Sequence, residues 1–115
     1  MSLQSEFIVH FTGMSHLVHA VALGKGFWDE ERNDGEMIAL MHSELSEALE
    51  ALRNGNPPDE HWHYGLEFSS VEVELADCII RIMDFAAGKN LRVAEALCAK
   101  NAFNSNRPYK HGKVF

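Results

Sequence analysis

The sequence predicts an all-α protein, a four-helix-type bundle, and three observations lead to this fold class. Four segments carry apolar residues at helical spacing, no segment alternates convincingly like a strand, and Gly, Pro or Asn stand between the segments. With 115 residues, of which 46% are hydrophobic, the chain can build one compact domain with a modest core. We therefore expect a single domain over residues 1–115.

The first helix is expected over residues 3–23, where apolar residues recur at steps of three and four. Its histidines His16 and His19 are interpreted as solvated side chains on the helix surface. The glycines at 24 and 26 end the helix, and Trp28 follows in a loop with Phe27. Two interpretations of Phe27 and Trp28 stay open: packing into the core, or an aromatic platform on which a nucleobase stacks.

The second helix is expected over residues 35–54, capped by Asn33 or Asp34. Glu44 and Glu47 are spaced i, i+3 and lie at the edge of its apolar arc. A carboxylate at the border of a core needs a partner, because burying it alone is costly.

The third helix is expected over residues 71–88, and its apolar residues cover nearly the whole helical wheel. Such a helix is expected to be buried on most sides. Its main polar residues form one narrow line, here called the polar strip: Glu74, Asp77, Arg81 and Asp84. We expect this strip to face a cleft or the interior, with Arg81 holding the Asp77 carboxylate one turn away.

The last helix is expected over residues 91–105, capped by Asn90, and a non-helical tail follows it. Before the third helix, Pro57-Pro58 and the segment 61–64 (His-Trp-His-Tyr) predict a loop with a structural role.

Composition and charge exclude several classes of function. A net charge of −7 argues against binding nucleic acid or an anionic membrane through the whole surface. We find no apolar run as long as a membrane span and no signal peptide, and we interpret Cys78 and Cys98 as buried free thiols. These observations predict a cytoplasmic protein.

The two acidic pairs, Glu44-x-x-Glu47 and Glu74-x-x-Asp77, suggest a site for a hard metal. Four carboxylates on two packed helices repel one another unless a cation lies between them. Carboxylate oxygens suit Mg²⁺, with Mn²⁺ as a possible substitute, and Mg²⁺ usually completes its coordination with water and substrate phosphates. The sequence offers no nucleophile motif, so catalysis would rest on metal-activated water.

Basic and polar residues near the C-terminus can hold the rest of a phosphate-bearing substrate. Lys100 and Arg107 suit phosphate oxygens, and Asn104, one turn beyond Lys100, can bind a sugar or a phosphate. Tyr109 and Lys110 complete the predicted substrate-binding residues.

Both acidic pairs and this tail together resemble the MazG-like all-α nucleotide pyrophosphohydrolases. The resemblance rests on Glu44-x-x-Glu47, 26 intervening residues, Glu74-x-x-Asp77, and Lys100-x-x-x-Asn104-x-x-Arg107-Pro-Tyr, and it covers roughly residues 7–113. It implies hydrolysis of a (d)NTP between the α and β phosphates, giving a (d)NMP and pyrophosphate, with Mg²⁺. It also implies that the four acidic residues are metal ligands, and we predict that Glu47 and Glu74 take part in catalysis.

The resemblance further implies a homo-oligomer, a dimer or tetramer, in which paired helices complete the bundle. This agrees with a third helix too apolar for a lone four-helix monomer. Some relatives carry another Glu directly before the first acidic pair, where this chain has Ser43, so the number of metals stays open. Two alternatives also stay open: a non-catalytic helical dimer that serves as an interaction module, and a pyrophosphatase for phosphoribosyl-ATP or another nucleotide.

Overall fold

The computed structural model describes residues 1–55 and 67–115, and the predicted loop around Pro57-Pro58 and 61–64 lies outside these residues. The described residues contain four α-helices and no strand, which confirms the all-α class. The helices are α1 (Leu3–Gly24), α2 (Asp34–Arg53), α3 (Ser70–Lys89) and α4 (Val93–Ser105). A short 3₁₀ turn, η2 (Tyr109–Gly112), follows α4 in the tail.

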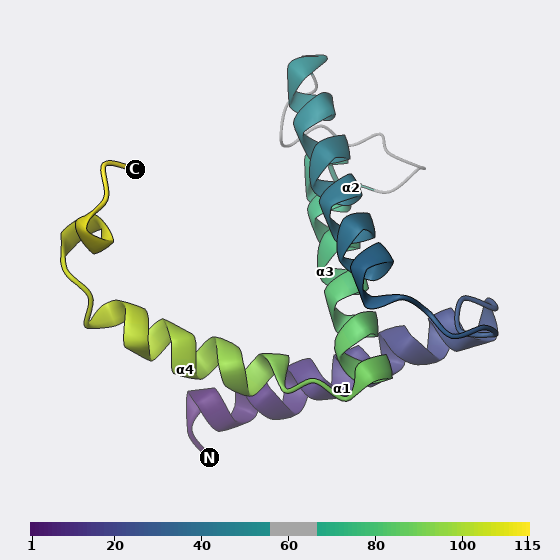
Figure 1. Ribbon diagram of the computed structural model, residues 1–115, viewed down its shortest axis with the longest axis horizontal. Helices are drawn as coiled ribbons and strands as arrows, with labels where there is room; N and C mark the ends of the chain where they lie inside the picture. The colour runs from purple at the N-terminus through teal and green to yellow at the C-terminus, as the bar shows by residue number, and fades with distance from the viewer. Residues whose placement is uncertain (56–66) are drawn as a thin grey trace.

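The helices form a hairpin and a crossing pair. In Figure 1, α2 and α3 lie side by side and antiparallel, α1 crosses the end of this hairpin, and α4 runs back along the N-terminal half of α1. The radius of gyration of 16.5 Å exceeds the roughly 13 Å expected for a compact domain of about 100 residues. One chain is therefore an open arrangement of helices.

Local signals fix the start of the hairpin helices. The Asn33 side chain accepts a hydrogen bond from the Glu36 N–H at 3.1 Å and caps α2, as predicted. Ser69 and Glu72 form a capping box at the start of α3. These caps satisfy backbone N–H groups at the first turns of α2 and α3 and define where the two helices begin.

The junction between α3 and α4 differs from the prediction. Asn90 is not the N-cap of the last helix but the C-cap of α3, with φ 58° and ψ 49°. Asparagine tolerates this left-handed conformation, and the Leu91 N–H then reaches the Ala86 carbonyl at 2.8 Å. The last helix consequently starts at Val93, without a side-chain cap.

The apolar core of one chain is thin. Its buried hydrophobic residues are small or medium in size: Met37, Ala48, Ala51, Cys78, Ala86 and Ala94. Larger apolar side chains on both hairpin helices are about half exposed, for example Leu49 at 57% and Ile79 at 49%. The expectation that α3 is buried on most sides is therefore wrong for a single chain.

The expectation that no run is long enough for a membrane span is also wrong. By length and composition alone α1 could cross a membrane. The core helix of a soluble protein or an N-terminal signal sequence meets the same criteria. In this chain α1 packs across α3 and contributes His19 to a polar contact with Asp84.

Candidate functional site

Three of the four predicted metal ligands meet between α2 and α3. Glu44 and Glu74 are each only 7% exposed, and Asp77 is half-buried. One carboxylate oxygen of each residue lies within 4.8 Å of the others. We call Glu44, Glu74 and Asp77 the acidic cluster. The i, i+3 spacing puts Glu74 and Asp77 on one face of α3, and Glu44 approaches them from the neighbouring helix α2.

The fourth predicted ligand, Glu47, lies at the exposed edge of the acidic cluster. Its carboxylate is within hydrogen-bonding reach of both Glu74 and Glu44. A hydrogen bond between two carboxyl groups needs a proton on one of them. The four acidic groups are therefore close enough to compete for protons or to share a cation.

The acidic groups affect one another's protonation. Burial, followed by the hydrogen bonds to Glu47 and Glu44, raises the pKa of Glu74 to about 8. Burial also acts to raise the pKa of Glu44, but Arg81 and the hydrogen bonds to its acidic neighbours outweigh burial and lower that pKa. At neutral pH and without a cation, Glu74 is thus mainly protonated beside an ionised Glu44.

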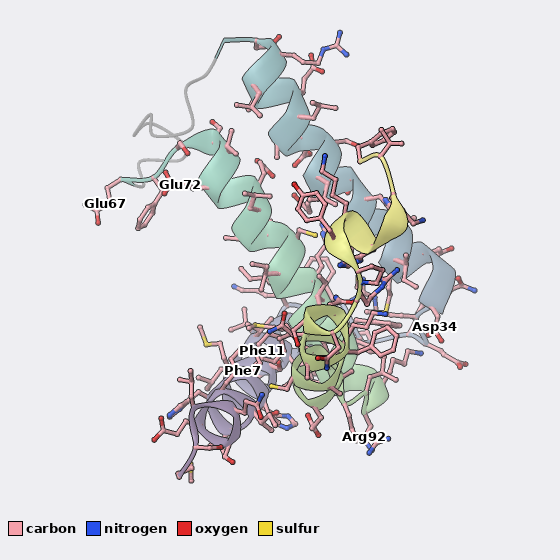
Figure 2. The ribbon with its side chains drawn as sticks, turned by 90° about the vertical axis from the view of Figure 1, so that its left-hand side faces the viewer. Phe7, Phe11, Asp34, Glu67, Glu72 and Arg92 are labelled. Carbon is pink, nitrogen blue, oxygen red and sulfur yellow. The ribbon has the colours of Figure 1, made fainter. Side chains whose placement is uncertain are left out.

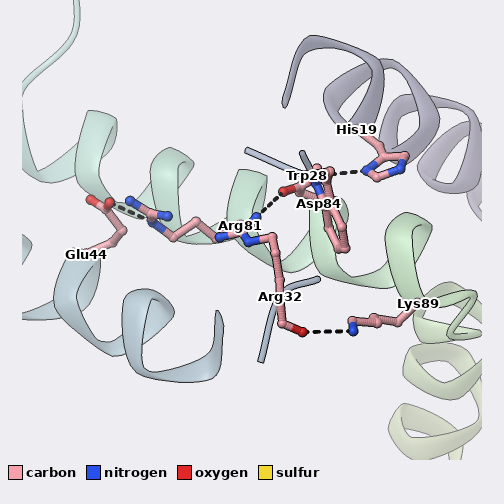
Figure 3. Close-up of polar contacts among 7 residues, drawn as sticks. All are labelled: His19, Trp28, Arg32, Glu44, Arg81, Asp84 and Lys89. Atoms are coloured by element: carbon pink, nitrogen blue, oxygen red, sulfur yellow. Dashed lines mark hydrogen bonds and ion pairs between the residues drawn. The ribbon is translucent and has the colours of Figure 1, made fainter. Parts of the chain in front are cut away.

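Arg81 neutralises one side of the acidic cluster. Its Nε donates to Glu44 Oε1 at 2.8 Å, as Figure 3 shows. We predicted that Arg81 would hold Asp77, and the contact with Glu44 on α2 was missed. Glu44 Oε2 is buried, and none of the described residues donates to it unless Glu74 or Glu47 carries a proton.

The chemistry of this donor set fits a hard divalent cation. The ligand atoms are carboxylate oxygens without His or Cys, which suits Mg²⁺ or Mn²⁺ better than Zn²⁺. Such a cation would replace the proton that Glu74 otherwise holds beside Glu44 and Glu47. Ser43, directly before the first acidic pair, donates its hydroxyl to the Leu40 carbonyl of its own helix at 2.6 Å.

Asp84, the last residue of the polar strip, lies at a second polar centre near the crossing of α1 and α3. It accepts hydrogen bonds at 2.8 Å from His19 Nδ1, at 2.9 Å from Trp28 Nε1 and at 3.1 Å from Arg32 Nη1. Figure 3 shows these partners around the carboxylate. We call Asp84 and its three partners the Asp84 cluster. Its inclusion of His19 corrects the prediction that this histidine is solvated.

Trp28 has packing contacts in this cluster. The Arg32 guanidinium lies 5.1 Å from the ring centroid, and the indole lies so close to Gly88 that a Cβ there would clash with it. These contacts support the packing interpretation. The stacking of a nucleobase on Trp28 stays a prediction.

The predicted substrate-binding residues of the tail lie apart from the acidic cluster within one chain. Lys100 and Arg107 lie beside the Phe103 ring, at 4.6 and 6.0 Å from its centroid. Tyr109 is 89% exposed, with Lys110 5.9 Å from its ring. In Figure 1 this tail extends away from the hairpin.

Asn104, a predicted substrate-binding residue, has a buried polar atom without a hydrogen-bond partner among the described residues. The residue is half-buried, and the atom is its Oδ1. Figure 2 shows the chain from the side of the tail, with α4 in front of the hairpin.

Comparison of the chain with known protein families, with curated proteins and with solved structures gives no match.

Proposed function

We propose that this chain is a Mg²⁺-dependent nucleotide pyrophosphohydrolase that cleaves a (d)NTP between the α and β phosphates, giving a (d)NMP and pyrophosphate. The observation that carries the proposal is the acidic cluster, with three carboxylates from two helices within 4.8 Å of one another. The resemblance of the acidic pairs and the tail to MazG-like enzymes supplies the reaction. A phosphoribosyl-ATP or another nucleotide is an alternative substrate for the same chemistry.

In this proposal Glu44, Glu47, Glu74 and Asp77 hold the metal. Bound Mg²⁺ supplies a Lewis acid for the phosphates and lowers the pKa of attacking water. Arg81 keeps Glu44 Oε1 engaged, which leaves the buried Oε2 for the cation. Glu47, which is exposed, would accept a proton from water once the bound cation has displaced the proton of Glu74 into solvent.

The protein works as a homo-oligomer in this proposal. The half-exposed apolar side chains of α2 and α3, among them Leu49 and Ile79, need a second surface to cover them. A second copy would complete the helical bundle, and its Lys100 and Arg107 are candidates for the phosphates that this chain's own tail does not reach.

The same exposed apolar faces favour a second candidate function, a non-catalytic helical dimer that serves as an interaction module. Addition of Mg²⁺ separates the two functions. Metal that binds the native state raises the melting temperature of the enzyme, whereas it changes that of an interaction module little.

Pyrophosphate release from a panel of (d)NTPs with Mg²⁺ tests the enzyme directly. We expect Glu47→Gln and Asp77→Asn to lower turnover by a factor of at least about 10 to 100. Substitution of residues that only support metal ligands typically causes a loss of this size, and substitution of a ligand should cost no less. Glu50→Gln, an exposed acid on the same helix as Glu47, is the matched control and should keep wild-type turnover. Equal turnover in all the variants would reject these ligands.

A further inference from the structure

A cavity of about 280 Å³ adjoins the acidic cluster and opens between α1, the loop after α1, and α3. Glu44 and Asp77 line one part of it. Other parts are formed by residues outside the predicted site, and three of these, Lys25, Phe27 and Arg32, combine positive charge with an aromatic ring. The volume is close to the lower end of the range usual for small-molecule sites.

The backbone fixes Lys25 and Phe27 at the end of α1. Lys25 is the C-cap, Gly26 follows with φ 88°, and the Phe27 N–H bonds to the Ala22 carbonyl at 3.1 Å. This is a Schellman arrangement, in which the glycine takes the left-handed conformation that a side chain disfavours. Both side chains therefore start from a rigid helix end rather than from a loose loop.

The three cations around the cavity differ in how they are paired. Arg81 is engaged by Glu44, and Arg32 donates to Asp84 through one of its five N–H groups. Lys25 is exposed and has no ion pair with any of the described residues. Lys25 and the remaining donors of Arg32 are consequently available to an anion beside the metal ligands.

Phe27 provides an apolar contact at the same cavity. Its side chain is 62% exposed, although the neighbouring Trp28 is held in the Asp84 cluster. Val18, Val21 and Ile80 complete an aliphatic wall next to it. An exposed aromatic ring beside aliphatic side chains is a suitable surface for a planar base.

We infer that this cavity holds the nucleoside triphosphate: Lys25 and Arg32 bind its phosphates beside the metal, and Phe27, not Trp28, stacks on its base. The inference rests on the proposed function and names the groups of this same chain that recognise the substrate. The Asp84 cluster acts as a positioning element, because Asp84 holds the guanidinium of Arg32 at the edge of the cavity.

Calorimetric binding of two ligands, in the presence of Mg²⁺, tests the inference with the whole chain. The ligands are a (d)NTP analogue with a non-hydrolysable α,β bridge, and inorganic tripolyphosphate. Lys25→Gln is expected to weaken both at least about tenfold, the effect of losing one charge-assisted hydrogen bond. Phe27→Leu is expected to weaken the nucleotide by a similar factor and to leave tripolyphosphate unchanged.

Two controls match the substitutions in chemistry. Arg53→Gln removes an exposed cation from the far end of α2, and Phe115→Leu removes an exposed aromatic ring at the C-terminus. Both should bind like the wild type. Because Lys25 and Phe27 are exposed, their variants are expected to keep the wild-type melting temperature.

The inference is overturned if Lys25→Gln and Phe27→Leu bind the nucleotide like the wild type, or if Phe27→Leu weakens tripolyphosphate as much as it weakens the nucleotide. Wild-type turnover alongside either result rejects the cavity and keeps the proposed function. A wild-type protein that binds no nucleotide, releases no pyrophosphate and is not stabilised by Mg²⁺ rejects both.

Discussion

One polar strip on α3 serves two centres that differ in how their carboxylates are balanced. Asp84 is buried and accepts hydrogen bonds from His19, Trp28 and Arg32, so a single carboxylate has three donors. At the acidic cluster, three carboxylates lie within 4.8 Å of one another, and Arg81 is bonded to one of them. The two centres share α3 but lie at different contacts of this helix: the acidic cluster faces α2, and Asp84 faces α1 and the loop after it.

This difference separates a structural carboxylate from a candidate ligand. Where donors match the acceptors, a buried charge can be stabilised by the fold alone. Where carboxylates outnumber the cations, one of them must be protonated or a further cation must bind. The balance between carboxylates and cations, rather than burial alone, therefore distinguishes a candidate metal ligand from a carboxylate that the fold satisfies.

The largest effect is expected from the same substitution made at both centres. Asp84→Asn should lower the free energy of unfolding by about 3–5 kcal/mol, because it leaves Arg32 without its charged partner and replaces one of the two acceptor oxygens with an NH2 group. Asp77→Asn in metal-free protein should cost at most about 1 kcal/mol, since it also relieves repulsion within the acidic cluster. Urea unfolding without metal measures both, and equal losses would remove the distinction between the centres.

A second comparison concerns how tightly the Asp84 cluster is packed. Gly88→Ala places a Cβ against the Trp28 indole, and such overpacking typically costs about 1–3 kcal/mol. Gly13→Ala is the matched control, because nothing else lies within 4 Å of a Cβ at that position of α1. It should stabilise the protein by about 0.5–1 kcal/mol through helix propensity.

Thermal or urea unfolding of the two glycine variants gives the sign of each change. A stabilising Gly88→Ala would show that Trp28 can move away from α3 without loss. Trp28 would then be available as the base platform that the sequence suggested.

Local patterns in the sequence predict most of the helical structure. The expected range 35–54 differs from α2 (Asp34–Arg53) by one residue at each end, since the apolar period and the Asn33 cap are both local signals. The end of α3 is harder to predict from the sequence, because Asn90 is compatible both with an N-cap and with a left-handed C-cap. Only the packing of α3 against its neighbours decides between these two uses.

The candidate site shows the same limit. The pairs Glu44-x-x-Glu47 and Glu74-x-x-Asp77 are visible because i, i+3 spacing is a property of each helix by itself. The partners of Asp84 are 52 to 65 positions away in the chain, so no local pattern reports them. The pairing of Arg81 with Glu44 was missed for the same reason, although the strip that contains Arg81 was recognised.

The last expected effect is a pH dependence specific to the acidic cluster. Because the pKa of Glu74 is raised from 4.5 to about 8 in the folded state, its proton stabilises metal-free protein fully below about pH 4.5. This stabilisation is lost as the pH rises toward about 8, by at most about 1.4 kcal/mol per pH unit. Glu44 acts in the opposite direction and at lower pH, since its pKa is lowered.

Glu74→Gln should remove this loss, since an amide does not ionise, and unfolding midpoints from pH 5 to 9 measure it. The difference between the wild type and Glu74→Gln is the quantity to compare, because contributions of other titratable groups cancel in it. Metal should reverse the trend in the wild type: because Mg²⁺ displaces the proton of Glu74, its apparent affinity should rise up to tenfold per pH unit and level off above about pH 8. Parallel stability curves for the two proteins, together with metal binding that is independent of pH, would mean that Glu74 holds neither the proton nor the cation. Glu74 would then be removed from the candidate metal ligands.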